Sequence, residues 1–515
     1  MTEIVRVQPK YLHHRLDVRY NSPSAVNARM AIASSGLKVR PVGQLLELVC
    51  GPFGSTLTSD EHCPHGEVLL VQPTNLSGEL FSDDTSWRIT KNDLVEKGLK
   101  LYTEGTLLFA RVGIYPHTGV LPQGCGLVTI SSSMIAGIPV KSIDTYYLAS
   151  FFQSAIGYQL LLAAQKVTAQ PTIGTSEIGA TEVPVPQELV QKYIGDKVRQ
   201  AERLRAWAKH LERSVKEVFE ADIQWNDKIL RVPNYGKVGS TEIEGRLDLK
   251  FNSPQRISLK RHFHSANVET DNLAGLADIS AMIGWKGLTT EFYRDSGPWL
   301  LRGVEFNDGI INTDSLVCVD EFKYLEQPQI HLKENDVAFS KDGTIGKAVV
   351  IPLLPNRLAA GSTIARLRIK ESESLDPYYL EFALGHPCVQ VQVESFATGI
   401  AQPHITQEWI ARLEIPRIKS EEAIADMWRQ HHAALSEAKG LTKAAKQLVE
   451  SLIDGVLAEQ QLIDSQKALE SDDNSLDREI LGRLTTKGLD GDGDPLFVDL
   501  DQLYDLLAQC QQMDE

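Results

Sequence analysis

The turn at residues 340–347 carries the side chains best suited to binding chemistry in this chain. Its sequence, Ser-Lys-Asp-Gly-Thr-Ile-Gly-Lys, places Lys341 and Lys347 beside two glycines, with Thr344 near its centre. Glycine lets backbone amides approach a phosphate closely, and lysine supplies the positive charge that a phosphate attracts. The turn is therefore a candidate phosphate contact. An ordinary hairpin turn with exposed lysines explains the same residues equally well.

A related segment, residues 111–118, occurs earlier in the chain with the sequence Arg-Val-Gly-Ile-Tyr-Pro-His-Thr. It keeps a basic residue, Arg111, and a glycine, but it has Pro116 where Gly346 would align. The two segments thus share a turn-like composition and differ in their polar side chains. We expect both to be surface turns of the same kind.

A second pair of segments, residues 166–170 and 398–404, offers hydrogen-bonding side chains. Each contains a glutamine, Gln170 or Gln402, followed by proline. Glutamine can pair through two hydrogen bonds with an adenine edge. The two segments belong to two copies of one pattern, described below, and a residue that both copies keep is expected to serve what the copies share. The repeated glutamines are therefore interpreted as structural or phosphate-facing residues.

Polar residues that are not repeated are better candidates for sequence discrimination, because they differ between the two modules. Their donors and acceptors could reach base edges, and their charges could reach phosphates. These residues are His117, Lys166, Trp285, Lys286, Arg302 and His404.

Motifs for catalysis were sought and are absent from the sequence. It has no phosphate loop of the form GxxxxGK[ST], no GxGxxG after a strand, no HExxH and no GxSxG. A cluster at residues 62–65 has no second ligand pair at zinc spacing, and a surface loop is the better interpretation. Acidic residues 490–501 resemble a calcium loop, but Pro495 stands where that loop needs glycine. We expect a non-catalytic protein without metal or cofactor.

The elements that must position these residues occur twice. The segment Arg15-Leu-Asp-Val-Arg-Tyr-Asn-Ser-Pro23 returns as Arg246-Leu-Asp-Leu-Lys-Phe-Asn-Ser-Pro254, and further matches follow in the same order. A period this long indicates two whole domains, because solenoid repeats recur about every 20 to 50 residues. The repeated arginine and aspartate are interpreted as ion pairs that fix the start of each module.

Each copy has the same internal plan. Short apolar runs with β-type composition, such as residues 106–110 and 337–339, are separated by glycine and proline and predict a β-rich domain. A short amphipathic helix follows, near residues 144–164 and 377–394, and then a strand that ends in proline. The fold class is therefore α+β. We expect domains at 1–186 and 223–418, the latter with a linker at 223–245, helices at 187–222 and 419–465, and an acidic C-terminal segment with short helices at 466–515.

Both helical segments carry a heptad pattern of apolar residues. In the first, Lys197 interrupts the pattern by taking a core position. The spacing is typical of coiled-coil strands, although ordinary bundle cores show it as well. Because one segment follows each copy, we expect the two to pair antiparallel, with a pseudo-twofold relation between the copies. A helix of about 30 residues is about 45 Å long.

Composition limits the remaining classes. With 42% hydrophobic residues and no long apolar run, the chain is expected to be a globular protein of the cytoplasm that makes no membrane contact. Its six cysteines form no CxxC pair and are expected to be reduced thiols. The formal net charge is −16, and residues 466–515 hold thirteen acidic and four basic residues, so the rest of the chain carries only −7. A nucleic-acid site must therefore be a local patch.

The order of these features resembles the DNA-specificity subunit of type I restriction-modification systems. The resemblance covers roughly residues 15–460 and is carried by the duplication, the turn 342–347, the Tyr-Tyr-Leu helix starts at 146–148 and 378–380, the segment 401–405 and the strand 413–416. It implies that the two β-rich domains are target recognition domains, each reading half of a split double-stranded DNA target. It also implies that the helices separate these domains and bind two DNA adenine methyltransferase subunits. In that family restriction and translocase subunits are added for cleavage, and the resemblance leaves open whether they join this chain.

Two half-sites about 34 Å apart, one turn of DNA, suit reading domains held apart by helices of this length. Two other hypotheses stay open. The acidic balance also suits a scaffold with the specificity-subunit fold that binds protein partners of a defence complex and reads no DNA. The acidic C-terminal segment could also compete with DNA for a basic groove.

Overall fold

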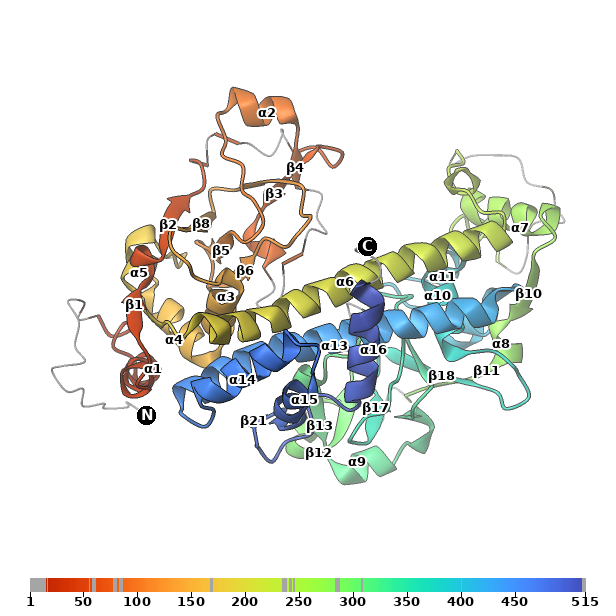
Figure 1. Ribbon diagram of the computed structural model, residues 1–515. Coiled ribbons are helices and arrows are strands. Elements are labelled where there is room, and N and C mark those ends of the chain that lie inside the picture. The colour runs from red at the N-terminus through yellow and green to blue at the C-terminus, as the bar shows by residue number, and fades with distance from the viewer. Residues whose placement is uncertain are drawn as a thin grey trace. The chain divides into compact units, whose positions relative to one another are not determined.

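The computed structural model describes residues 15, 17–54, 56–57, 62–76, 81–82, 87–166, 170–233, 239, 243, 246–282, 288–306, 309–399 and 401–511. The chain forms two compact units (Figure 1). Unit 1 comprises residues 1–206 and 437–515, and unit 2 comprises residues 207–436. Two long helices, α6 (Glu188–Asp222) and α13 (Glu421–Ile453), each contribute one half to unit 1 and the other half to unit 2.

The β-rich part of unit 1 contains three small sheets. The largest has the strand order β2-β8-β5-β6, and a second has the order β4-β3-β7, in which β3 and β7 run parallel. A two-stranded sheet joins β1 to β9. The strands are β1 (Val39–Pro41), β2 (Leu46–Cys50), β3 (Val68–Val71), β4 (Arg88–Ile89), β5 (Leu107–Ala110), β6 (Thr118–Val120), β7 (Leu127–Ile130), β8 (Met134–Pro139) and β9 (Glu182–Pro184).

The β-rich part of unit 2 repeats this topology. Its sheets have the orders β11-β18-β15-β16 and β13-β12-β17-β14, with β12 and β17 parallel, and β10 pairs with β19. The strands are β10 (Glu269–Asn272), β11 (Ala277–Ala281), β12 (Tyr293–Leu301), β13 (Val317–Val319), β14 (His331–Leu332), β15 (Val337–Ser340), β16 (Ala348–Val350), β17 (Leu358–Ala360), β18 (Ile364–Ile369) and β19 (Glu414–Arg417). The duplication read from the sequence is therefore a duplication of fold.

Central strands β5 and β15 read as continuous apolar runs because both of their faces are covered. Every residue of both strands is buried. In unit 1, Leu108 packs in a cluster with β3 and β7 residues, and Phe109 contacts Phe152 of helix α3 (Thr145–Gln153) with ring centroids 5.3 Å apart. Strands covered on both faces lack the alternating pattern of half-exposed strands. The sheets thus hold the turn after β5 or β15 on a rigid core.

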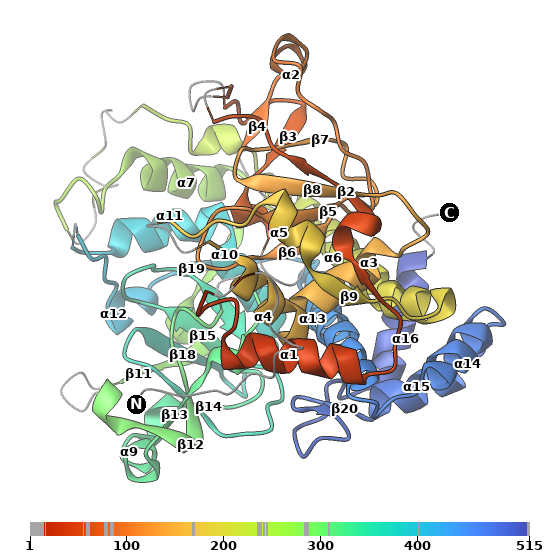
Figure 2. The same ribbon diagram turned by 90° about the vertical axis from the view of Figure 1, so that its left-hand side faces the viewer.

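Helices pack against these sheets in each unit. Helix α1 lies beside α4 in unit 1 (Figure 2). In unit 2, α7 packs against α11. The helices of the β-rich parts are α1 (Pro23–Ser34), α2 (Lys91–Glu96), α3 (Thr145–Gln153), α4 (Ala155–Ala164), α5 (Thr175–Ala180), α7 (Pro254–Ser265), α8 (Leu273–Leu276), α9 (Glu321–Leu325), α10 (Pro377–Gly385), α11 (Pro387–Phe396) and α12 (Gln407–Ile410).

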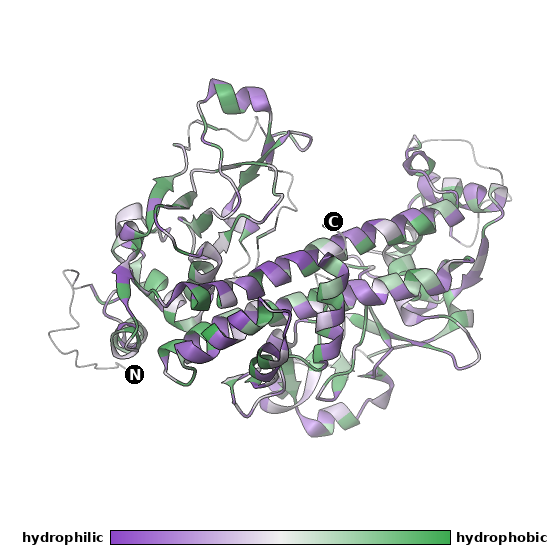
Figure 3. Ribbon diagram, in the orientation of Figure 1, coloured by the Kyte–Doolittle hydropathy of each residue, from purple (hydrophilic) through white to green (hydrophobic). Residues whose placement is uncertain are grey.

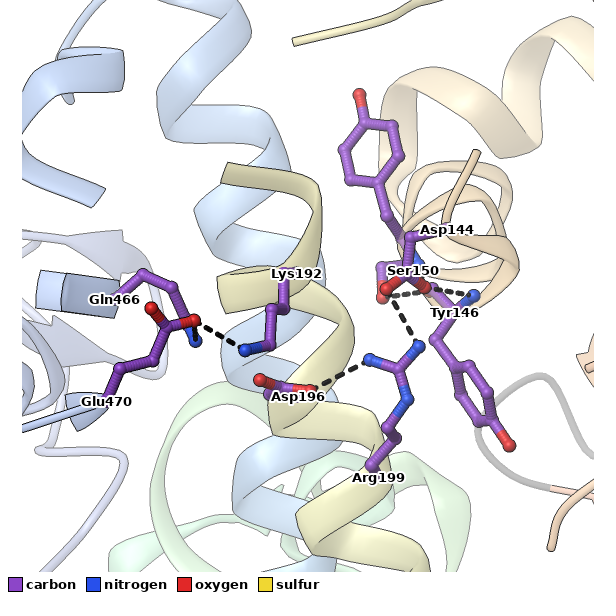
Figure 4. Close-up of polar contacts among 9 residues, drawn as sticks. Asp144, Tyr146, Ser150, Lys192, Asp196, Arg199, Gln466 and Glu470 are labelled. Atoms are coloured by element: carbon purple, nitrogen blue, oxygen red, sulfur yellow. Dashed lines mark hydrogen bonds and ion pairs between the residues drawn. The ribbon is translucent and has the colours of Figure 1, made fainter. Parts of the chain in front are cut away.

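A joint between each β-rich part and its long helix is built in the same way. The carboxylate of Asp144 caps α3 by accepting hydrogen bonds from the amides of Tyr146 and Tyr147. Arg199 of α6 donates to Asp144 at 2.7 Å and to Asp196 at 2.9 Å, and its guanidinium lies over the Tyr146 ring (Figure 4). In unit 2, Arg429 bonds to Asp376 and Asp426 and lies over Tyr378. The buried hydroxyls of Tyr147 and Tyr379 donate to the carbonyls of Pro184 and Pro416, respectively.

The long helices pack together, as the fold class predicted. Unit 1 holds the first half of α6 and the second half of α13, whereas unit 2 holds the opposite halves, so the helices pair antiparallel. Heptad residues are buried in both units, with Ala201 and Leu441 in unit 1 and Leu211 and Ala434 in unit 2. Polar residues cover much of the rest of these helices in Figure 3. In unit 2, the buried ring of His431 bonds to the carbonyl of Ala208 at 2.9 Å.

The acidic C-terminal segment folds onto the helices within unit 1. It contains α14 (Glu459–Leu469), α15 (Ser475–Gly482), the hairpin β20 (Leu484–Thr485) and β21 (Gly488–Leu489), and α16 (Leu500–Gln511). Helix α16 buries Leu503 and Leu506, and Phe497 lies where a side chain on Gly440 of α13 would clash. Helix α16 is therefore docked on the rest of unit 1 through its apolar face. No described helix is long and apolar enough to cross a membrane.

A buried polar cluster fixes this segment to α6. The ammonium of Lys197, 0% exposed, lies 2.7 Å from the carboxylate of Asp477, which is 1% exposed. The hydroxyls of Tyr193 and Tyr504 donate to the same carboxylate, each at 2.5 Å. Lys197 interrupts the heptad pattern because its partner is supplied by α15. Burial favours the protonated acid, but Lys197 and the two hydroxyls outweigh it and hold the pKa of Asp477 below its usual value.

Candidate nucleic-acid interface

Three connections of unit 1 meet at one edge of its sheets. They are the turn 111–117 after β5, the turn 131–133 between β7 and β8, and the segment 165–173 after α4, of which residues 167–169 lie outside the described part. We call them loop platform 1. Backbone hydrogen bonds join all three. These bonds run from Arg111 N to Ser133 O (2.8 Å), Gly113 N to Pro171 O (3.1 Å), Ile173 N to Arg111 O (2.9 Å) and Lys166 N to Thr172 O (2.7 Å).

Unit 2 repeats the arrangement with residues 341–347, 361–363 and 397–405, of which residue 400 is not described. We call this set loop platform 2. Each bond has a counterpart of nearly the same length. These bonds run from Lys341 N to Thr363 O (2.8 Å), Gly343 N to Pro403 O (3.0 Å), Ile405 N to Lys341 O (2.9 Å) and Thr398 N to His404 O (2.8 Å).

The structure thus brings together the two pairs of segments that the sequence singled out separately. In unit 1, the Arg111–His117 turn meets the segment that contains Lys166 and Gln170. In unit 2, the turn with Lys341, Thr344 and Lys347 meets the segment with Gln402 and His404. The side chains Trp285 and Lys286 lie outside the described residues. The two glutamines are exposed, so neither is needed to fill a core.

Side chains of loop platform 1 are partly held in place by the fold. Lys166 is 59% exposed, and its ammonium lies 2.9 Å from the carboxylate of Glu177. Arg111 donates to the carbonyl of Ser132 at 3.3 Å. Burial lowers the pKa of His117, so its imidazole is neutral at neutral pH and can both donate and accept. This combination offers charge for phosphate and a neutral hydrogen-bonding ring.

Loop platform 2 has a different set of side chains on the same backbone. The carboxylate of Asp342 bonds to both Lys341 and the ring of His404. Gly346 has a φ of +89°, and a side chain there would meet Gln390, whose amide donates to the Gly346 carbonyl at 2.8 Å. Only glycine suits that conformation and that close approach. Pro116, its counterpart in unit 1, marks a local difference between the two turns.

Arg302 lies next to loop platform 2, because Leu301 O accepts the amide of Gly361 at 2.8 Å. Its guanidinium is committed to the buried carboxylate of Glu305, which also accepts the Arg302 amide at 2.6 Å. The hydrogen bonds that the guanidinium donates to Glu305 raise the pKa of Arg302. Arg302 and Glu305 are three residues apart, and the turn between them brings the two side chains together.

Sequence reasoning did not single out two exposed side chains of loop platform 1. Ile114 is 66% exposed and Tyr115 is 61% exposed, both at the tip of the turn. Apolar residue types give no signal of exposure by themselves. Among the described residues, no group of three or more His, Cys, Asp or Glu side chains is arranged to hold a metal ion.

The repeated motif that begins at Arg15 and at Arg246, which we call the head motif, makes equivalent contacts in the two units. Arg15 bonds to Asp17 at 2.9 Å and to the carbonyl of Ala164 at 2.9 Å. Arg246 bonds in the same way to Asp248 and to the Phe396 carbonyl. These contacts tie the start of each copy to its α4 or α11 helix end. They agree with the structural interpretation of the motif.

No protein-family model matches this chain, and no curated protein matches it. Among solved structures, a type I restriction-modification S subunit from M. genitalium aligns with 84% of this chain and 96% of its own, at 13% identity and a TM-score of 0.38. The HsdS subunit from Thermoanaerobacter tengcongensis aligns with 82% of this chain and 97% of its own, at 15% identity and a TM-score of 0.27. The type IIG restriction endonuclease BpuSI aligns with 40% of this chain at a TM-score of 0.28. Type I specificity subunits, which the repeated motifs resemble, are thus among the solved structures similar to this chain.

Proposed function

We propose that this chain is the DNA-recognition subunit of a type I restriction-modification complex and reads a bipartite duplex target. The observation that carries the proposal is the pair of loop platforms. Their backbone hydrogen bonds match, whereas their side chains differ. A protein that reads two different half-sites with one duplicated fold needs this combination, because the shared backbone positions the loops and the variable side chains discriminate.

The chemistry of the platforms suits duplex DNA. Lys347, Arg111 and Lys166 supply cations for phosphates, and backbone amides near Gly343 supply further donors. Lys341 is 12% exposed and paired with Asp342, so in this proposal it supports the turn from within. His117, Thr344 and His404 supply neutral or polar groups for base edges. The local character of these groups is compatible with a net charge of −16, because the excess acid lies mostly in the C-terminal segment.

The family resemblance supplies the partners of the proposed complex. Two DNA adenine methyltransferase subunits would each serve one half-site, and restriction and translocase subunits would join for cleavage. The duplicated joints around Arg199 and Arg429 support a role in which each β-rich domain is held on its helix in the same way. In this proposal the chain itself carries out no chemistry.

The test combines adenine methylome sequencing with binding in vitro. A strain that lacks this gene should lose methylation of one bipartite motif, and the purified complex should bind that motif more tightly than a scrambled duplex. Between about 50 and 200 mM salt, affinity should fall steeply if phosphates are contacted. Lys347→Ala should reduce the salt slope by about one. Lys419→Ala, at a side chain that is 85% exposed on the segment before α13, is the matched control and should not change it.

A scaffold that binds only proteins is the second candidate, and the acidic balance favours it. It predicts no retention on duplex DNA and salt-insensitive association with a protein partner. An unchanged methylome in the deletion strain together with that behaviour would replace the DNA-reading proposal. Truncation after Asp464 tests the related idea of competition by the acidic segment, since tighter DNA binding would then follow.

A further inference from the structure

The tips of the two loop platforms differ in what they expose. In loop platform 1 the tip is Ile114 and Tyr115, 66% and 61% exposed. The aligned residues of loop platform 2 are Thr344, which is exposed, and Ile345, which packs against the core of unit 2. One turn therefore presents two adjacent apolar side chains to solvent. The other presents a hydroxyl.

The exposed position of Ile114 and Tyr115 is imposed by a well-bonded turn. The amide of Gly113 donates to Pro171 O, and the amide of His117 donates to the Tyr115 carbonyl at 3.0 Å. The ring of Tyr115 lies 5.8 Å from the His117 ring, between centroids, at an interplanar angle of 33°. A turn fixed at both ends holds its side chains outward without a large entropic cost on binding.

The surroundings of this tip suit a contact with the base edges of a duplex. Arg111 lies at the start of the turn, and Lys166 lies on the adjacent segment, paired with Glu177. Cations at the base of an apolar tip are placed for phosphates when the tip enters a groove. In the major groove the apolar group of a base pair is the C5-methyl of thymine, which aliphatic and aromatic side chains contact.

We propose that Ile114 and Tyr115 read the C5-methyl of a thymine in the half-site bound by unit 1. The inference rests on the proposed DNA-reading function and adds the chemistry of one contact. At the equivalent position of unit 2, Thr344 offers a hydroxyl that can hydrogen-bond to a base edge and only one methyl group, so the tip of loop platform 2 lacks the two adjacent apolar side chains of loop platform 1. The two tips thus read by different chemistry on one backbone.

Deoxyuridine substitution tests this contact directly, because it removes the methyl and leaves the hydrogen-bonding edge unchanged. The purified complex is titrated with duplexes of its methylome-derived motif in which each thymine of either strand is replaced in turn. For the wild-type chain we expect about a fourfold loss of affinity at a thymine of one half-site, the value of one buried methyl group.

Variants at the tip test whether Ile114 and Tyr115 make the contact with the methyl group. Ile114→Ala and Tyr115→Ala should bind the thymine duplex more weakly and lose the further penalty for deoxyuridine. Tyr115→Phe should keep the penalty, because the ring is retained. Thr344→Ala is the matched control in unit 2 and should leave the deoxyuridine penalty unchanged. Thermal melting of each variant checks that the exposed positions do not affect folding.

The failure modes are distinct. If the wild-type complex reads a bipartite motif but every deoxyuridine duplex binds as well as its thymine parent, the methyl contact is wrong and the DNA-reading function stands. A penalty that persists unchanged in Ile114→Ala and Tyr115→Ala also overturns the assignment. If the variants lose a protein partner and not DNA affinity, the tip is a protein contact. Absence of any bipartite motif removes the proposed function and this inference together.

Discussion

The two long helices meet different demands at equivalent positions. Arg199 and Arg429 both join an aspartate cap, so residues 230 apart correspond, and by this register Lys197 of α6 matches Met427 of α13. Met427 packs against the core of unit 2, whereas Lys197 pairs with Asp477 of the C-terminal segment. Helix α6 thus has a lysine where α13 has an apolar residue, and this lysine binds a C-terminal segment that has no counterpart after the first copy.

The two loop platforms combine a shared backbone with different side chains. Their backbone bonds match within a few tenths of an ångström. Gln170 and Pro171 recur as Gln402 and Pro403, whereas most other side chains of the platforms differ. Where both copies meet the same structural demand, their residues agree, as at the Asp144 and Asp376 caps. Where the residues do not serve the shared fold, as at the tips of the loop platforms, the two copies differ. Divergence between the copies therefore points to the surfaces that matter for function.

The largest expected effect comes from copying Met427 into unit 1. Lys197→Met leaves Asp477 buried without its cation, so we expect a loss of about 3 to 5 kcal/mol in the free energy of unfolding of unit 1. Lys197→Met with Asp477→Asn should recover most of it, because the amide oxygen still accepts from the tyrosine hydroxyls. Chemical denaturation measures both. A single variant as stable as the wild type would show that the cluster does not hold the segment.

A second comparison concerns pH. Burial lowers the pKa of His386 and His431 in unit 2 to about 4, whereas burial raises the pKa of Glu202 and Glu437 in unit 1 to about 8 and about 7. As the pH falls, these histidines take up a proton at a higher pH in the unfolded chain than in the folded one. Unit 2 therefore loses stability as pH falls from about 6.5 to about 4. The glutamates act oppositely, and unit 1 loses stability as pH rises above about 4.5 toward 8.

At the acid end, each histidine contributes at most on the order of 3 kcal/mol to this loss. Hydrogen–deuterium exchange, corrected for the intrinsic rate and followed at about pH 5 and about pH 8, should show unit 2 less protected in acid and unit 1 less protected in base. His431→Leu should weaken the acid effect in unit 2. Equal changes in both units would contradict the comparison.

The joints offer a test of equivalence. Arg199→Lys and Arg429→Lys each replace a guanidinium that bonds to two carboxylates by a single ammonium. Both arginines are more than one third exposed, so we expect a cost of only about 1 kcal/mol, and the same cost in each unit. Local exchange rates at the starts of α3 and α10 report it. A cost confined to one unit would break the equivalence.

The smallest effect is expected at the repeated head motif. Val18 and Leu249 occupy matching positions and are 89% and 88% exposed. Val18→Ser and Leu249→Ser should each change the free energy of unfolding by less than about 0.5 kcal/mol. A melting curve for each variant is sufficient. A larger loss would mean that these side chains are covered within the folded chain.

Local sequence signals predicted several of these features. Helices were predicted near residues 144–164 and 377–394, and Asp144 and Asp376 cap the first helix of each region. The heptad pattern predicted the buried face of α6 and α13, and it marked Lys197 as the exception. The partner of Lys197 lies 280 residues away, and no local pattern identifies which distant carboxylate meets a given lysine. Arg302, by contrast, has its partner Glu305 only three residues away.

The sequence alone determined the duplication, the α+β plan and the pairing of two long helices, because order, periodicity and capping are properties of neighbouring residues. Only the tertiary structure decided which loops share a platform and which apolar side chains are left outside. Ile114 and Ile345 illustrate the reason: both are isoleucines on equivalent turns, but exposure depends on packing against distant residues. One is 66% exposed and the other packs against a core.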